Sequence, residues 1–117
     1  ITVYGDGQQS RCFLYVKDAV RALVGLMREP RARGEVFNVG AETEITIEDL
    51  AKRVQALVNP AAQIERVTYE KAYGEGFEDM RRRVPDTRKV RELIGWRPTV
   101  GIDEIIHSVA DYMRSHP

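Results

Sequence analysis

Residues 4–18 read Tyr4-Gly5-Asp6-Gly7-Gln8-Gln9-Ser10-Arg11-Cys12-Phe13-Leu14-Tyr15-Val16-Lys17-Asp18. This stretch combines a tight turn, an arginine beside apolar residues and the start of a helix. Asp6-Gly7 follows the apolar Ile1–Tyr4 and predicts a turn leaving a strand, because glycine adopts a positive φ at little steric cost. Asp18 is a candidate N-cap for a helix that runs to about Arg28. The stretch therefore predicts a strand, a loop and a helix in that order.

Arg11 is the candidate ligand-binding side chain within this loop. Its neighbours Phe13, Tyr15 and Val16 are expected to pack into a core and to fix the base of the arginine. A guanidinium held in this way suits a dianionic ligand, since its planar fork donates paired hydrogen bonds to phosphate oxygens and stays charged at any working pH. An ion pair between Arg11 and a carboxylate that holds the loop is the alternative, and the local residues leave both interpretations open.

Two further strands and a loop follow from the apolar pattern. A buried strand is expected at Glu35–Gly40, where β-branched and aromatic residues end at a glycine. A strand with one solvated face is expected at Ile64–Tyr69, where apolar and polar residues alternate. Glu70–Arg82 is charged, glycine-bearing and aperiodic, so a loop that is mobile without ligand is expected there.

Three more helices are expected downstream. Thr46 precedes an apolar face at helical spacing and has an acidic residue three positions later, which is typical of a capping box at a helix start. Asp86 is a candidate cap for a short helix, and Trp96 is expected to pack the terminal helix onto that short helix, with base stacking as the alternative. The expected helices are 46–58, 86–95 and 102–113.

The composition bounds the class of protein. The 117 residues are enough for a single domain, and 18 basic against 18 acidic residues give no net charge. Nucleic-acid and membrane-surface binders usually show a basic excess, so neither is expected as a partner. No apolar run is long enough for a membrane span, and the single Cys12 fits a cytoplasmic protein without disulfides. His107 and His116 lack neighbouring ligands, so no metal site is expected.

The chain opens on strand-like residues without an initiator methionine. We therefore expect it to be the carboxy-terminal part of a longer protein.

Four motifs, in order over nearly the whole chain, resemble the C-terminal part of a known enzyme family. They are Val3-Tyr4-Gly5-Asp6-Gly7 with Arg11-Cys12-Phe13 and Tyr15-Val16-Lys17-Asp18; Phe37-Asn38-Val39-Gly40; Thr46-Ile47-Glu48-Asp49-Leu50; and Arg83-Val84-Pro85-Asp86-Thr87-Arg88-Lys89 with Leu93-Ile94-Gly95-Trp96-Arg97-Pro98. The chain resembles the extended short-chain dehydrogenase/reductases, the NAD-dependent nucleotide-sugar epimerases, dehydratases and decarboxylases. Within them it most resembles the UDP-glucuronate decarboxylases (UDP-xylose synthases), with UDP-glucose 4-epimerases and dTDP-glucose 4,6-dehydratases close behind.

This resemblance implies the fold class. We expect an α/β fold, the C-terminal substrate-binding part of a Rossmann-type extended short-chain dehydrogenase/reductase, with short strands and about four helices. Residues 1–117 are expected to form a single nucleotide-sugar-binding domain that lacks the N-terminal dinucleotide-binding half.

The resemblance also implies site residues. Arg11 would contact the nucleotide diphosphate, and Tyr4 and Gln9 would lie near the base and ribose. A second arginine from the 81–83 segment would reach the diphosphate or the sugar. Arg83 fits best, Arg81 and Arg82 remain candidates, and a solvated basic loop is the alternative. Asn38 would meet ligand or, as is more usual, bond backbone in a turn.

Two features of the family's chemistry are missing from the sequence. Gly5-Asp6-Gly7 lacks the third glycine and the following helix of a dinucleotide-binding turn. No Tyr-x-x-x-Lys pair is present to act as acid/base, so no catalytic or cofactor-binding residue is assigned. We expect this chain to be inactive alone and to need NAD only as part of a full-length parent enzyme.

The sequence thus supports a UDP-sugar-binding portion of such an enzyme. The alternative is a non-catalytic module that keeps the fold, has lost the ligand and associates through apolar surface. On the first interpretation the chain stands alone or pairs with its Rossmann half. On the second it associates with itself, and Val36–Val39 and the apolar face of the 46–58 helix are the expected contacts. A nucleic-acid binder led by Arg81–Arg83 is a distant third.

Overall fold

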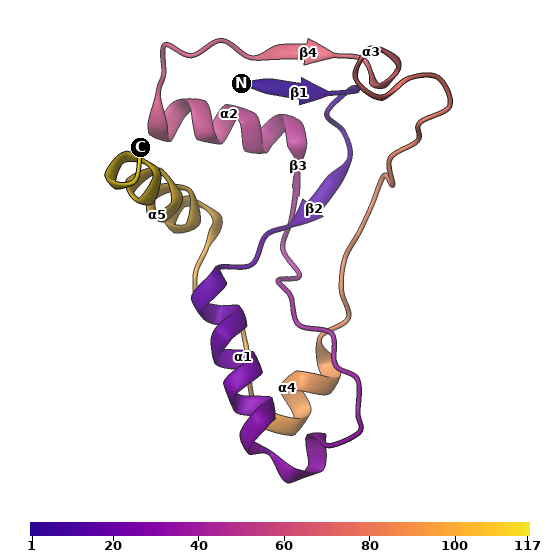
Figure 1. Cartoon of the computed structure of the whole chain (residues 1–117), viewed down its shortest axis with the longest axis vertical. Coiled ribbons are helices and arrows are strands. Elements are labelled where there is room, and N and C mark those ends of the chain that lie inside the picture. Colours follow the sequence, from indigo (N-terminus) through magenta and orange to yellow (C-terminus); the bar gives the residue numbers. More distant parts are fainter.

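The computed structural model describes residues 1–117 and shows an α/β fold with short strands (Figure 1). The strands form two pairs: β1 is parallel to β4, and β2 is antiparallel to β3. In chain order the elements are β1 Thr2–Tyr4, β2 Ser10–Cys12, α1 Val16–Arg28, the short 3₁₀ helix η1 Pro30–Ala32, β3 Glu44–Thr46, α2 Ile47–Val58, β4 Glu65–Val67, α3 Tyr69–Tyr73, α4 Arg88–Ile94 and α5 Ile102–Ser115.

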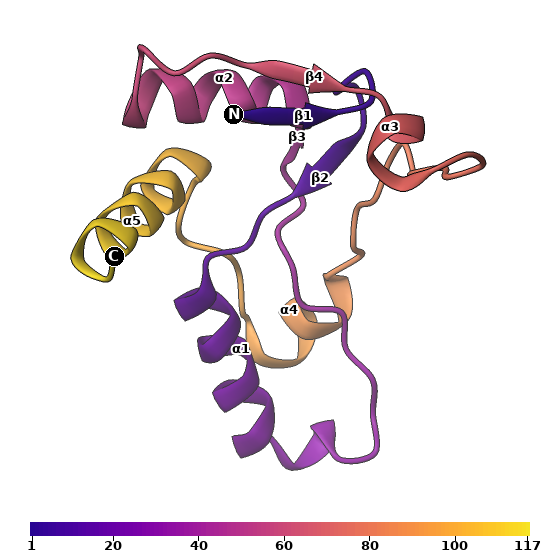
Figure 2. The ribbon, with the colours of Figure 1, turned by 45° about the horizontal axis from the view of Figure 1, so that its top comes forward.

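The elements lie in two parts joined by β2, β3 and two connecting segments (Figures 1 and 2). One part holds β1 and β4 with α2 against them, α3 at one end and α5 beside α2. The other part holds α1 and α4, which pack against each other. The β2–β3 ribbon is therefore the link along which the chain passes from one part to the other.

The core between α1 and α4 is small. Its buried members are Ala22, Val90 and Trp96, with partly buried neighbours that include Leu14 and Phe37. The indole Nε1 of Trp96 donates to the backbone oxygen of Asp18 at 2.9 Å. The prediction that Trp96 joins the terminal helix to the preceding one is wrong, because its core partners come from α1 and α4.

Asp18 has a different role from the predicted N-cap. Helix α1 begins two residues earlier, at Val16, and Asp18 lies buried in its first turn. Its carboxylate accepts hydrogen bonds from the backbone nitrogens of Thr99 and Val100 at 2.8 and 3.1 Å, and from the Thr99 hydroxyl at 2.8 Å. Asp18 therefore ties α1 to the segment that leads into α5.

The strand predicted at Glu35–Gly40 is wrong. Residues 35–43 have no regular structure and pair with no strand, and the side chain of Val36 is 82% exposed. A β-strand is stable only when a neighbour takes up its backbone hydrogen bonds, whatever its side chains. The apolar pattern alone therefore does not make this segment a strand.

The helix predictions are confirmed except at two starts. The Thr46 hydroxyl accepts from the Asp49 backbone nitrogen at 3.1 Å and caps α2. The N-cap of α4 is Thr87 rather than Asp86, although an Asp86 carboxylate oxygen accepts from the Arg88 nitrogen at 3.1 Å. Gly95 ends α4 in the left-handed region at φ 66°, as expected of a C-terminal glycine.

The segment predicted as a loop at 70–82 contains an additional helix. Residues Tyr69–Tyr73 form α3, whose start is capped by the Thr68 hydroxyl, which accepts from the Lys71 nitrogen at 3.3 Å. Only one turn and a half is helical, too short for apolar periodicity to be visible in the sequence. The remainder, 74–87, is the long connection from α3 down to α4 in Figure 1.

The molecule is open rather than compact. Its radius of gyration is 17.1 Å, whereas a compact domain of this length has about 13 Å. Its accessible surface is 8407 Å², whereas a monomer of this mass exposes about 6,400 Å². This surface includes the apolar face of α1, where Val20, Leu23 and Met27 are 51%, 57% and 86% exposed. None of the helices has the length and apolar character needed to cross a bilayer.

Candidate functional site

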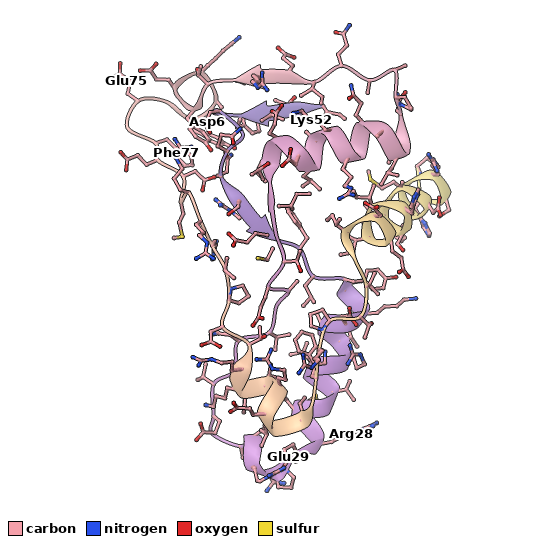
Figure 3. The ribbon with its side chains drawn as sticks, turned by 180° about the vertical axis from the view of Figure 1, so that it is seen from behind. Asp6, Arg28, Glu29, Lys52, Glu75 and Phe77 are labelled. Carbon is pink, nitrogen blue, oxygen red and sulfur yellow. The ribbon has the colours of Figure 1, made fainter.

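The structure brings four of the five predicted site residues to one corner of the molecule. Tyr4 ends β1, Gln9 and Arg11 flank the start of β2, and Arg81 comes from the connection between α3 and α4. In Figure 3, Asp6, Glu75 and Phe77 mark this corner, far from Arg28 and Glu29 at the opposite end. The strand pairing of β1 with β4 explains the convergence, because it carries α3 and the connection back beside the loop after β1.

The predicted turn between β1 and β2 is confirmed, and it requires glycine. Gly5 and Gly7 have φ values of 69° and 73°, in the left-handed region. A Cβ on Gly5 would lie 2.5 Å from the ring of Tyr69, and a Cβ on Gly7 would lie 3.0 Å from that of Glu48. These glycines therefore let Tyr69 and Glu48 pack against the turn.

Arg11 is held by three acceptors. Its Nη1 donates to the backbone oxygens of Ser10 and Met80, both at 2.7 Å, and its Nη2 donates to the carboxylate of Asp79 at 2.6 Å. The Arg11 side chain is only 20% exposed. Arg11 is thus held by these acceptors and not by the predicted packing of its neighbours, of which Val16 is 65% exposed. The carboxylate partner of the alternative interpretation is present. Asp79 was not recognised in the sequence.

Tyr69 connects Gln9 to Asp79. The Tyr69 hydroxyl accepts from the Gln9 side-chain nitrogen at 2.7 Å and donates its one proton to Asp79 at 3.3 Å. Gln9 is buried and also donates to the Tyr4 backbone oxygen, whereas its own side-chain oxygen has no partner. Burial and the negative charge of Asp79 raise the pKa of Tyr69. The side chains of Gln9, Tyr69, Asp79 and Arg11 therefore form one continuous hydrogen-bond network.

The three consecutive arginines differ in their partners. Arg81 donates twice to the carboxylate of Asp6, at 2.7 and 2.9 Å, and Arg82 makes two bonds of 2.9 Å to Glu44. Hydrogen bonds from these arginines lower the pKa of Asp6 and of Glu44. Arg83 is exposed and has no carboxylate within 4 Å. Of the three, it alone has its charge available to a ligand without breaking an ion pair.

Three aromatic rings, those of Tyr4, Tyr73 and Phe77, lie beside this network. Tyr73 contacts Tyr4 and Phe77 with ring centroids 5.5 and 4.5 Å apart, and Phe77 contacts Tyr69 at 5.4 Å. Tyr4, Tyr73 and Phe77 remain 40%, 55% and 45% exposed. An exposed aromatic cluster beside arginines is suited to a ligand that has both a flat ring and phosphate. Tyr73 and Phe77 were missed because the segment lacks periodicity.

A groove elsewhere on the molecule has a different lining. It encloses about 780 Å³ and is lined by β3, the start of α2 and residues 96–102. None of the five predicted site residues lines it, and its charged residues include both signs, such as Arg53 and Asp49. Asn38, the weaker candidate, lies near α4 beside Asp86 and Lys89. The structure therefore does not bring Asn38 to the network around Arg11.

Comparison with known proteins places this chain. Residues 1–109 match the GDP-mannose 4,6 dehydratase family. UDP-N-acetyl-alpha-D-glucosaminuronate decarboxylase of Bacillus cytotoxicus is 37% identical over 97% of the chain and 35% of its own length. UDP-glucuronic acid decarboxylase 4 of Arabidopsis thaliana is 41% identical over 87% of the chain and 21% of its own length. The chain spans about a third or less of the length of these curated relatives.

A solved structure agrees with the sequence matches. The UDP-glucose 4-epimerase of Thermotoga maritima, determined with UDP-glucose, superposes with a TM-score of 0.84 and 28% identity over 99% of the chain and 35% of its own. The predicted resemblance to the nucleotide-sugar enzymes of the extended short-chain dehydrogenase/reductases and the predicted fold class are both confirmed.

Proposed function

The chain belongs to the GDP-mannose 4,6 dehydratase family, and from this membership we propose that it is the nucleotide-sugar-binding portion of a larger NAD-dependent enzyme. That enzyme would decarboxylate, epimerise or dehydrate the sugar of a nucleotide sugar. The observation that carries the proposal is the convergence of Tyr4, Gln9, Arg11 and Arg81 at one corner, with Arg83 unpaired in the same segment. The interaction-module alternative has no comparable support.

Within this class we favour decarboxylation of a UDP-linked uronic acid, with UDP-glucuronate as the substrate. Both relatives described above are named as decarboxylases of UDP-linked uronates, at 37% and 41% identity. We place the reaction in the cytoplasm, which the free thiol of Cys12 fits.

Each site residue receives a role in this proposal. Arg11 and Arg83 would bind the diphosphate. Their two guanidinium forks with paired donors would replace the water that the negatively charged pyrophosphate loses on binding. Arg11 has five N–H donors and uses three of them in the structure, which leaves two for a ligand. Tyr4 and Gln9 would lie beside the base and ribose, and Arg81 is the second candidate for the phosphate.

NAD does not fit the glycine turn of this chain. In a dinucleotide-binding turn the glycines let a pyrophosphate approach the backbone, and a helix N-terminus follows. Here the side chains of Tyr69 and Glu48 occupy the space beside Gly5 and Gly7, and a strand follows instead of a helix. The proposed NAD site and the acid/base pair therefore belong to the remainder of the enzyme, and no step through NAD is assigned to these residues.

We also propose that the apolar face of α1 packs against that remainder. Val20, Leu23 and Met27 form an exposed stripe on α1, and Val36, in the segment after η1, is more than four-fifths exposed. The face that the sequence suggested, on α2, is covered by β1 and α5, with Ala51 only 5% exposed. Burying an apolar stripe of this kind is strongly favourable.

A ligand panel tests the proposed function. The purified chain is titrated with UDP, UDP-glucuronate, dTDP and NAD, and the melting temperature is followed. A ligand that binds the native state raises the melting temperature by mass action. We expect a shift with the two UDP compounds and none with NAD. A folded sample in which UDP compounds give no shift would count against the proposal.

A further inference from the structure

Asp79 forms an ion pair with Arg11, the arginine that the proposed function assigns to the diphosphate. The Arg11–Asp79 contact is 2.6 Å, and both side chains are partly shielded, at 20% and 32% exposure. A guanidinium that is largely removed from water needs an anionic partner, because leaving it unpaired is strongly destabilising. Without ligand, Asp79 supplies that partner.

Of the three ion pairs at this corner, Arg11–Asp79 has the fewest hydrogen bonds between its two partners. Arg11 gives Asp79 one hydrogen bond, whereas Arg81 gives Asp6 two and Arg82 gives Glu44 two. A phosphate group that meets a guanidinium can accept two parallel bonds and adds geometric selectivity to charge. Asp79 is therefore the carboxylate that an incoming phosphate displaces most readily.

The charges near Arg11 favour a diphosphate that displaces Asp79 over one that binds while Asp79 stays in place. Three of the four arginines, Arg11 and 81–83, are paired with carboxylates, and the exposed Glu75 and Glu78 of the same segment add further negative charge. A diphosphate brings at least two negative charges to this corner. If Asp79 stayed in place, the ligand would bind beside a carboxylate already engaged with Arg11, and like charges repel.

From these contacts, and resting on the proposed function, we infer that Asp79 is an internal competitor of the ligand's diphosphate for Arg11. Asp79 holds the unliganded site together and lowers its affinity for phosphate. On binding, the diphosphate takes the Nη2 donor of Arg11, and Asp79 keeps its hydrogen bond from Tyr69 or turns to solvent. The affinity for a nucleotide diphosphate is therefore set by a carboxylate that does not touch it.

The test substitutes Asp79 in the full chain. Asp79→Asn removes the competing charge and keeps the shape, and Glu78→Gln removes one charge from the adjacent exposed residue as a matched control. Calorimetry with UDP and with inorganic pyrophosphate gives the dissociation constants. We expect Asp79→Asn to bind both about tenfold more tightly, the scale of one lost charge-assisted hydrogen bond. Glu78→Gln should change either dissociation constant by less than about twofold.

A second variant, Asp79→Ser, has the same expected gain, so that a folding defect of one variant does not decide the result. Circular dichroism establishes that each variant is folded. Equal or weaker UDP binding by both folded Asp79 variants, relative to Glu78→Gln, would overturn the inference while leaving the proposed function intact. No UDP binding by any folded variant, wild type included, would overturn the proposed function and this inference with it.

Discussion

At the scale of single residues, Arg11 marks what neighbouring residues can and cannot predict. Its apolar neighbours indicate a side chain fixed by packing, whereas in the structure three hydrogen-bond acceptors hold it. Its carboxylate partner, however, lies 68 residues further along the chain. No pattern in one sequence pairs two charges at that separation, so the alternatives for Arg11 stayed open until the fold placed Asp79. Tyr69 and Gln9, 60 residues apart, are a second such pair.

Asp18 gives the residue-scale prediction for stability. Burial raises the pKa of its carboxyl, but hydrogen bonds from Arg21, Thr99 and Val100 outweigh that effect and lower the pKa to about 2. Because the folded value lies below the ordinary 3.8, Asp18 stabilises the fold above pH 3.8 and loses this contribution as the pH falls through about 2. The contribution near neutral pH is about 2 kcal/mol.

Asp18→Asn should therefore lower the free energy of unfolding by about 2 kcal/mol at pH 7. Urea unfolding at pH 7 and at pH 2.5 measures the difference. The difference in the free energy of unfolding between the variant and the wild type should be smaller at the lower pH. The control is Asp111→Asn, since Asp111 is an exposed carboxylate on α5 that pairs only with Arg114. A gap that is the same at both pH values would contradict the assigned role of Asp18.

At the scale of elements, local signals determine the helices and fail for the strand at 35–40. Helices close their hydrogen bonds within themselves, so Thr46 at the start of α2 and Gly95 at the end of α4 could be recognised from sequence. A strand depends on a partner elsewhere. Residues 35–40 have the composition of a buried strand, but they pair with no strand and Val36 is exposed.

Thr46→Ala tests the start of α2. Removing an N-cap hydroxyl costs about 1 kcal/mol, because the Asp49 nitrogen loses its acceptor. The loss should appear in global unfolding, since α2 contacts β1, β3 and α5. Thr43→Ala is the control, because Thr43 is exposed and outside any helix or strand. Equal stabilities of the two variants in urea would rule out a capping role for Thr46.

At the scale of the whole molecule, the chain exposes about 2,000 Å² more surface than a compact monomer of its mass. A standard stable interface buries about 800 Å² from each partner. The excess is therefore large enough for an extensive interface, and we propose the exposed stripe of Val20, Leu23 and Met27 as its centre. Composition gave no indication of this openness, because overall apolar content does not show which faces are covered.

The exposed stripe predicts that the isolated chain self-associates as its concentration rises. Replacing Leu23 and Met27 together by Glu should shift sedimentation toward the monomer without lowering the melting temperature, because both side chains are largely solvent-exposed. Arg28→Glu, at the end of the same helix, controls for the added charge. A wild-type chain that stays monomeric at all concentrations would show that the stripe is not an interface on its own.

The central claim is that this corner of the molecule binds the diphosphate of a nucleotide sugar. Calorimetry with UDP tests it most directly, on the wild type, Arg11→Ala, Arg83→Ala and the control Arg28→Ala. Arg28 is exposed at the opposite end of the molecule (Figure 3). We predict that the wild type and Arg28→Ala bind alike, that Arg83→Ala binds about tenfold more weakly, and that Arg11→Ala shows no measurable binding. Equal UDP affinity in all four folded proteins would contradict the account.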